Sequence, residues 1–124
     1  ARSFMYFDTS GITGTVATAT IKIHGYSGND GSVIAVKSTA FGGDGGTALA
    51  STDLDNISGF SAGSSLDGSA TVYAPQILTT NWSTSGYNDM TGTSDLKTDM
   101  QNNNVVIICF TMSTAKFLKL DNAL

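Results

Sequence analysis

The most constraining feature of this 124-residue chain is a run in which apolar and polar side chains alternate, from Val16 to Tyr26. Within this run, VATATIKIHGY, alanine or isoleucine alternates with threonine, lysine or histidine from Ala17 to His24. A period of two is the pattern of a β-strand with one buried and one solvent-facing side. The run therefore predicts a half-buried strand and favours a β fold.

Four further segments predict strands, and the turns around them are rich in glycine, serine, asparagine and aspartate. The first, RSFMYF, is aromatic on both sides, so we expect burial on both sides. SVIAVKSTAF should turn successive side chains from Val33 to Val36 to opposite sides. TVYAPQI contains the only proline, Pro75, which favours an edge strand or a strand end, and VVIICF is typical of a central buried strand.

Glycine and serine dominate residues 42–70, which predict a long ordered loop with one helical turn near STDLDN. Ser51 or Thr52 would cap that turn. We expect four apolar side chains to hold the loop on the core, and they are Leu54, Ile57, Phe60 and Leu66.

A short helix is predicted near residues 94–101, with Leu96 and Met100 on one face. Residues 114–124 fit either a final strand or a short helix. With strands about a dozen residues apart, the chain 1–124 predicts a single all-β domain, an antiparallel β-sandwich with one short helix.

Composition excludes several classes of function. The net charge is -4 and the six basic residues are scattered, which argues against nucleic acid as a partner. No apolar run reaches the roughly 18 to 20 residues of a membrane span, so membrane insertion is not expected. The single cysteine, Cys109, lies within VVIICF and is expected to be a buried, inert thiol.

Catalytic chemistry finds little support in the sequence. Asp8-Thr9-Ser10-Gly11 resembles an aspartic-protease turn, but its glycine stands one position too late and no second copy exists. We expect Asp8 to cap a turn instead. His24 is the only histidine and falls on the polar side of its strand, and glutamate is absent. No enzyme activity, cofactor or metal is expected, and calcium held by loop aspartates is only a weak alternative.

Aromatic side chains are the candidates for glycan binding, because a sugar ring can stack on them. Trp82, Tyr87, Tyr73 and Tyr26 are the available rings. Core packing is favoured over sugar binding for Trp82, whereas both roles stay open for the tyrosines.

Six segments together resemble the pattern of DNRLRE-type jelly-roll domains. They are ARSFMYFDTSGI, ATIKIHGY, VIAVKSTAF, WSTSGYNDM, SDLKTDMQNN and VVIICF. The resemblance covers most of the chain and implies a β-sandwich of jelly-roll type, in proteins associated chiefly with bacteriophage and marine viral virions. Related sandwiches serve as carbohydrate-binding modules.

Two departures from that pattern bear on assembly. The Arg-Phe motif begins at Ala1, where the family has a preceding strand, and STAKFLKLDNAL does not match the family's ending. These departures predict a fragment, a processed form, or a sheet completed by a neighbouring chain through strand addition.

The sequence thus predicts a non-enzymatic structural protein on a virion surface, such as a capsid decoration or a fibre or tail component. Its expected partners are other virion proteins and further copies of itself. The alternative is a glycan-binding module of a phage fibre or of a secreted cell-surface protein.

Overall fold

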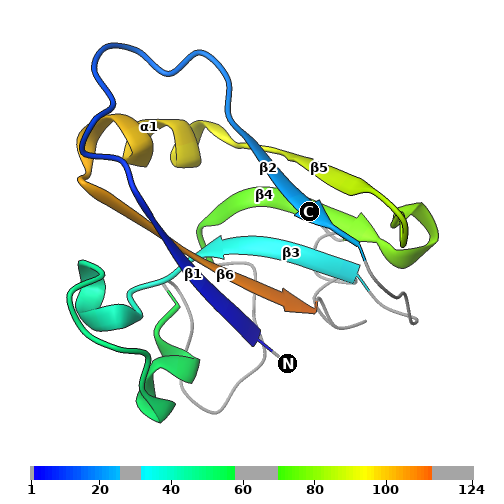
Figure 1. Ribbon diagram of the computed structural model, residues 1–124, viewed down its shortest axis with the longest axis horizontal. Helices are drawn as coiled ribbons and strands as arrows, with labels where there is room; N and C mark the ends of the chain where they lie inside the picture. Colours follow the sequence, from blue (N-terminus) through cyan, green and yellow to red (C-terminus); the bar gives the residue numbers. More distant parts are fainter. Residues whose placement is uncertain (1, 26–31, 58–69, 113–124) are drawn as a thin grey trace.

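The computed structural model describes residues 2–25, 32–57 and 70–112, and it is mostly β-structure with one α-helix (Figure 1). The strands are β1 (Arg2–Asp8), β2 (Thr20–His24), β3 (Ser32–Lys37), β4 (Val72–Leu78), β5 (Tyr87–Thr91) and β6 (Val105–Met112). The α-helix is α1 (Ser94–Asn102), and three short 3-10 helices are η1 (Phe41–Gly43), η2 (Ser51–Asp55) and η3 (Thr79–Asn81). One sheet has four strands in the order β1-β6-β3-β4, and β2 and β5 form a second, two-stranded sheet. All strand pairs are antiparallel, which confirms the predicted fold class at this level.

The two inner strands of the larger sheet carry the core. β6 lies between β1 and β3, and its residues from Val106 to Thr111 are all buried, as predicted for VVIICF. On β3, Ala35 belongs to the buried cluster that faces the smaller sheet, called the inner cluster here, and its neighbours Ile34 and Val36 belong to the buried cluster on the opposite face, called the outer cluster. The predicted alternation of β3 is therefore confirmed, and the larger sheet is covered by apolar side chains on both faces.

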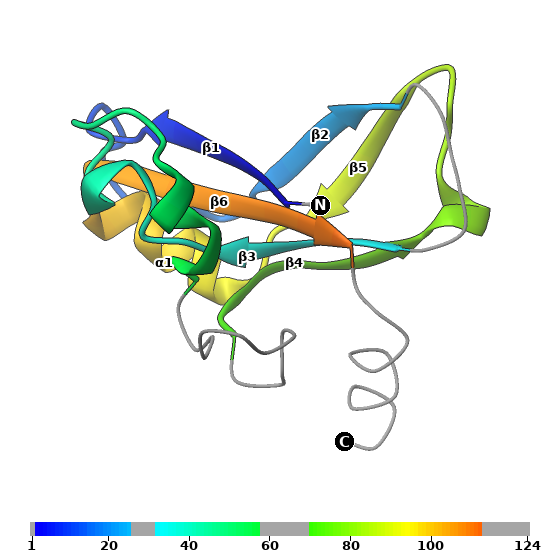
Figure 2. The same cartoon turned by 90° about the horizontal axis from the view of Figure 1, so that it is seen from below.

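The smaller sheet packs onto one face of the larger one. Ile21 and Ile23 of β2 and Met90 of β5 join the cluster that contains Ile108 and Phe110 of β6. Figure 2 shows the β2–β5 ribbon on one side of the larger sheet. The predicted alternation in this strand is confirmed, although the strand begins only at Thr20.

β1 is not buried on both sides, so this part of the sequence prediction was wrong. β1 is an edge strand, and Met5, Tyr6 and Phe7 are 51%, 51% and 46% exposed. Phe4 packs against the outer cluster, and the Tyr6 ring meets that of Phe41 edge to face. Aromatic residues on both faces of a strand show only that each face is apolar. Whether a face is buried depends on whether another element packs against it.

The opposite edge of the larger sheet is β4. Pro75 lies exposed in β4, as expected for a proline in an edge strand, and the β3–β4 register shifts between the pairs Val33↔Ile77 and Val36↔Val72. Thr93 forms hydrogen bonds with this edge, and its N–H donates to the carbonyl of Tyr73 at 2.9 Å. Its hydroxyl donates to the carbonyl of Val72 at 2.7 Å.

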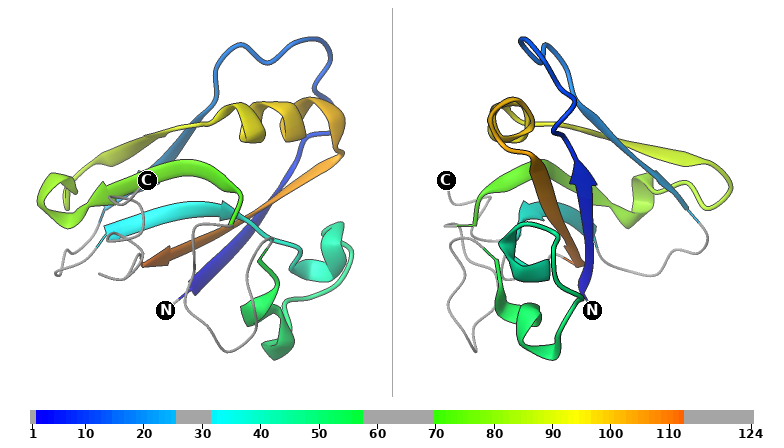
Figure 3. Two further views of the ribbon diagram at one scale, coloured as in Figure 1. Left: turned by 180° about the vertical axis from the view of Figure 1, so that it is seen from behind. Right: turned by 60° about the vertical axis from the view of Figure 1, so that its left-hand side comes forward.

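α1 lies across one end of the two layers (Figure 3). Thr93 is its N-cap, and the Thr93 hydroxyl accepts the Leu96 N–H. Leu96 is buried in the inner cluster and Met100 packs against the same cluster. The predicted helix and its apolar face are both confirmed.

The described part of the loop after β3, residues 38–57, runs beside the larger sheet, away from the β2–β5 ribbon (Figure 3). The predicted helical turn is present as η2, but neither Ser51 nor Thr52 caps it. Asp53 does so from inside the turn, because its carboxylate accepts the N–H of Ala50 at 2.9 Å. Asp53 also accepts the N–H of Phe41 at 3.3 Å and a side-chain amide N–H of Asn56 at 2.6 Å. These hydrogen bonds, the one from Ala50 first, lower the pKa of Asp53.

Only part of the predicted anchoring of that loop can be located. Ile57 is 4% exposed and packs in the outer cluster, whereas Leu54 is 53% exposed, so its side chain is not packed on the core. Phe60, Leu66 and the C-terminal residues 114–124 lie outside the described residues.

Candidate functional site

The side of the molecule between β1 and β2 is open and apolar. A cavity of about 310 Å³ lies at one end of this side, and its walls include Phe7, Ile21 and Met100. A second cavity, also of about 310 Å³, lies toward the start of β1, between Met5 and Trp82. We call this pair of cavities, together with the exposed β1 edge, the β1 face.

The β1 face exists because β1 and β2 belong to different sheets. Ser3, Met5 and Phe7 alternate along β1 and line these two cavities, and Ile23 of β2 and Phe110 of β6 contribute to the second. The larger sheet thus extends one strand beyond what the smaller sheet covers. Large apolar side chains exposed together on an edge strand mark an interaction surface.

The turn after β1 holds the end of that strand in place. Asp8 accepts hydrogen bonds from the Ser10 N–H at 2.9 Å and from the Ser10 hydroxyl at 2.6 Å. These bonds lower the pKa of Asp8, the side-chain bond contributing most. Thr9 is buried, and its N–H donates to the carbonyl of Asn104 at 2.9 Å. The predicted turn-capping role of Asp8 is confirmed.

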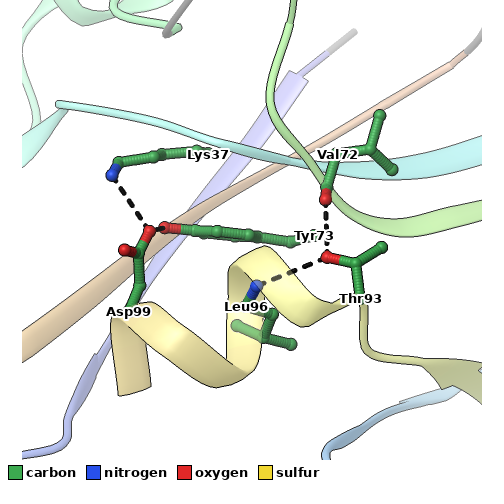
Figure 4. Close-up of polar contacts among 6 residues, drawn as sticks. All are labelled: Lys37, Val72, Tyr73, Thr93, Leu96 and Asp99. Carbon is green, nitrogen blue, oxygen red and sulfur yellow. Dashed lines mark hydrogen bonds and ion pairs between the residues drawn. The ribbon is translucent and has the colours of Figure 1, made fainter. Parts of the chain in front are cut away.

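A polar network joins the larger sheet to α1 (Figure 4). Asp99 of α1 accepts a hydrogen bond from the Tyr73 hydroxyl, and the Lys37 amine lies 2.9 Å from the same carboxylate oxygen. Lys37 and Asp99 side chains are 33% and 19% exposed. The three residues are far apart in the sequence, and no local pattern links them. Because each polar group has a partner, the network fastens the helix to the sheet.

Through the ionisation of Tyr73, the network should make the free energy of unfolding fall at alkaline pH. Burial, followed by the Asp99 contact, raises the pKa of Tyr73 far above the usual 10.0. The unfolded chain then loses this proton first, so the contribution to stability is complete below about pH 10 and falls as the pH rises further. Chemical denaturation of wild type and Tyr73→Phe between neutral pH and pH 10.5 should show the difference in stability shrinking above about pH 10. A difference that stays constant would contradict this assignment.

Tyr73, one of the sequence candidates for glycan binding, is enclosed in the core. Its ring is 1% exposed, within the inner cluster, and cannot stack on a sugar. Tyr26 lies outside the described residues. Trp82 is half-buried on the wall of the second cavity, whereas Tyr87 is 67% exposed.

Tyr87 borders a more polar cavity of about 630 Å³ between β4 and β5, whose walls include Gln76, Asn81 and Asp89. The Tyr87 ring is held edge to face against His24, with ring centroids 5.2 Å apart. His24 is exposed on the polar side of β2, as predicted. Trp82 and Tyr87 border different cavities, so the structure does not join them into one stacking platform.

The remaining reactive groups are isolated. Cys109 is fully buried, and burial raises the pKa of its thiol to about 11, as suits the predicted inert role. Among residues 2–25, 32–57 and 70–112, no three histidine, cysteine or acidic side chains gather where they could hold a metal ion.

The described part of the chain contains no helix long and apolar enough to cross a membrane. Comparison with protein-family models, with curated proteins and with solved structures gives no match.

Proposed function

We propose that this protein is a structural assembly domain, a virion surface component such as a capsid decoration or fibre protein, that acts through protein contacts. The observation that carries the proposal is the β1 face. An edge strand that exposes Met5, Tyr6 and Phe7 beside two apolar cavities is suited to contact with another protein. The sequence resemblance to virion domains supplies the virion part of the proposal.

The strand order supports a jelly-roll sandwich as the fold of this domain. In a jelly roll of about eight strands, the first, last, third and sixth strands form one sheet, and the second and seventh are neighbours in the other. The sheets β1-β6-β3-β4 and β2-β5 fit that arrangement. The two remaining strands would fall between β3 and β4, where the described residues hold η1, η2 and the isolated bridge Ser38↔Ile57.

Labelling of intact virus particles tests the proposed function. Antibodies raised against the purified chain should decorate the surface of virions produced from a genome that carries the gene, as seen by immunogold electron microscopy. Virions from the same genome with the gene deleted are the control. Unlabelled wild-type particles, with the protein found only in the fraction free of virions, would refute the proposal.

Glycan binding is the second candidate, and the cavity beside Tyr87 favours it. An exposed aromatic ring next to amide and carboxylate side chains can offer both stacking and hydrogen bonds to a sugar. On this hypothesis Tyr87→Ala should reduce binding on a glycan array about two- to tenfold, since one aromatic contact contributes roughly 0.5–1.5 kcal/mol. Trp82→Ala, on a different cavity, should leave glycan binding unchanged. Absence of saturable binding by the wild type would remove this candidate.

A further inference from the structure

We propose that β1 pairs with β1 of a second copy, antiparallel and centred on Met5, so that two larger sheets join into one. This inference rests on the proposed assembly function and identifies the contact by which two copies would associate. The partner is a second copy because the strand RSFMYFD is complementary to itself. It begins with a positive charge, Arg2, and ends with a negative charge, Asp8.

The backbone groups of β1 alternate between the two edges of the strand. The Thr9 N–H donates to Asn104 of the strand pair, and the register continues as Phe7↔Val106, Met5↔Ile108 and Ser3↔Phe110. Since hydrogen-bonded pairs alternate along an antiparallel ladder, the odd-numbered residues of β1 face β6. The N–H and C=O groups of Phe4 and Tyr6 then point to the outer edge. Among the described residues, no strand pairs with that edge.

These outward groups restrict the possible registers. Only a register that places even-numbered residues opposite even-numbered residues lets both strands form their hydrogen bonds. Centring the pair on Met5 satisfies this condition and sets Phe4 opposite the Tyr6 of the second copy. It also sets Arg2 opposite Asp8 at each end, which gives two cross-strand pairs of opposite charge. Shifting by two residues keeps the hydrogen bonds but loses both charge pairs.

The two charged residues of this contact lie at opposite ends of β1, and the Arg2 side chain is 15% exposed. Asp8 is exposed, and the Ser10 bonds lower the pKa of its carboxylate, which favours the ionised form. Arg2 donates to the carbonyl of Leu54 at 2.5 Å and to Asp55 at 3.3 Å, which holds its guanidinium at the start of β1. A guanidinium has several N–H donors in one plane and can serve more than one acceptor.

The same register explains the exposed apolar side chains. Opposite residues of an antiparallel pair share one face of the sheet, so Phe7 of one copy lies opposite Ser3 of the other. Ser3 lines the second cavity, beside Met5 and Trp82. The second copy therefore brings a phenylalanine ring to each of the two symmetry-related cavities, whose lining is mostly apolar. One two-fold contact covers Met5 and Phe7 together.

Charge reversal tests the register. Arg2→Asp alone places Asp opposite Asp8, and Asp8→Arg alone places Arg opposite Arg2, so each variant should raise the dimer dissociation constant roughly tenfold or more. An equimolar mixture of the two restores both opposite-charge pairs and should form heterodimers. Analytical ultracentrifugation and native mass spectrometry measure both effects. Asp95→Arg is the matched control, because Asp95 lies in the first turn of α1, next to the β4 edge. It should dimerise like the wild type.

Cysteine crosslinking is a second test of the β1 register, and it does not depend on repulsion between charges. Met5 lies on the two-fold axis in a pair without hydrogen bonds, where the Cα atoms approach to roughly 4.5 Å. Met5→Cys should therefore form an intermolecular disulfide under mild oxidation, whereas Phe7→Cys should do so only when mixed with Ser3→Cys. The native Cys109 is buried and does not interfere. Circular dichroism checks that each variant is folded.

A wild-type chain that stays monomeric at high concentration, with no Met5→Cys crosslink, would overturn the proposed pairing. So would a dimer whose charge variants fail to complement each other, because the contact would then lie elsewhere or in another register. The outcome is separable from the proposed function. If the chain is monomeric but antibodies still find it on virions, only the β1 pairing is refuted. If the chain forms the crosslinked dimer but is absent from virions, only the virion role is refuted.

Discussion

Replacing Ile108 with alanine should lower the free energy of unfolding by about 2–5 kcal/mol. Ile108 is 2% exposed and lies in β6, where it packs with side chains of both sheets and of α1. Truncation removes apolar burial and leaves a cavity that rigid neighbouring strands cannot close. Urea denaturation followed by circular dichroism measures the change, with the midpoint lowered and the slope retained.

Leu49→Ala is the matched control for this truncation. Leu49 is 50% exposed, so the same kind of change should alter stability by less than about 0.5 kcal/mol. If Ile108→Ala cost no more than Leu49→Ala, the packing of the smaller sheet and α1 over β6 would be wrong. A dimer through β1 adds to the apparent stability, so both variants should be compared at one protein concentration.

Removing the carboxylate of Asp99 should cost about 1–3 kcal/mol. Asp99→Ala leaves the Lys37 amine and the Tyr73 hydroxyl without their shared acceptor, and both are partly shielded from water. Partial exposure lets solvent compensate in part, so the expected cost is below that of a fully buried pair. Thermal unfolding by calorimetry should show the loss.

The ion pair of Lys22 and Asp89 provides the comparison. Its atoms are 3.0 Å apart, much like those of Lys37 and Asp99, but both side chains are more than half exposed. Asp89→Ala should therefore cost about 0–1 kcal/mol. If the two aspartate variants lost equal free energies of unfolding, the Lys37–Asp99 pair would behave as a surface ion pair and the Tyr73 contact would contribute nothing.

Much of the strand pattern could be predicted because it is local. The alternation around Ile21 and Ile23 indicates which side of β2 meets the core, and Pro75 indicates an edge, since both signals are properties of adjacent residues. The burial of β1 could not be predicted. Its aromatic residues fit a covered strand and an uncovered edge equally well, and the smaller sheet decides which one forms.

The candidate site was less predictable than the fold. Tyr73 and Tyr87 look alike in the sequence, yet one ring is enclosed beneath α1 and the other is exposed beside His24. The partner of Tyr73 is Asp99, and a pair separated by this much chain leaves no periodic signal. The β1 face likewise arises where two sheets diverge, which depends on the packing of whole layers.

The two edges of the larger sheet differ in a way that limits the size of an assembly. At β4, Pro75 lacks an N–H, the ladder is irregular, and Thr93 already occupies the carbonyls of Val72 and Tyr73. A sheet that can add a strand on one side only cannot polymerise by strand addition. If β1 pairs as proposed, the larger sheet stops growing at two copies, because β4 at its other edge offers no regular ladder to a further strand.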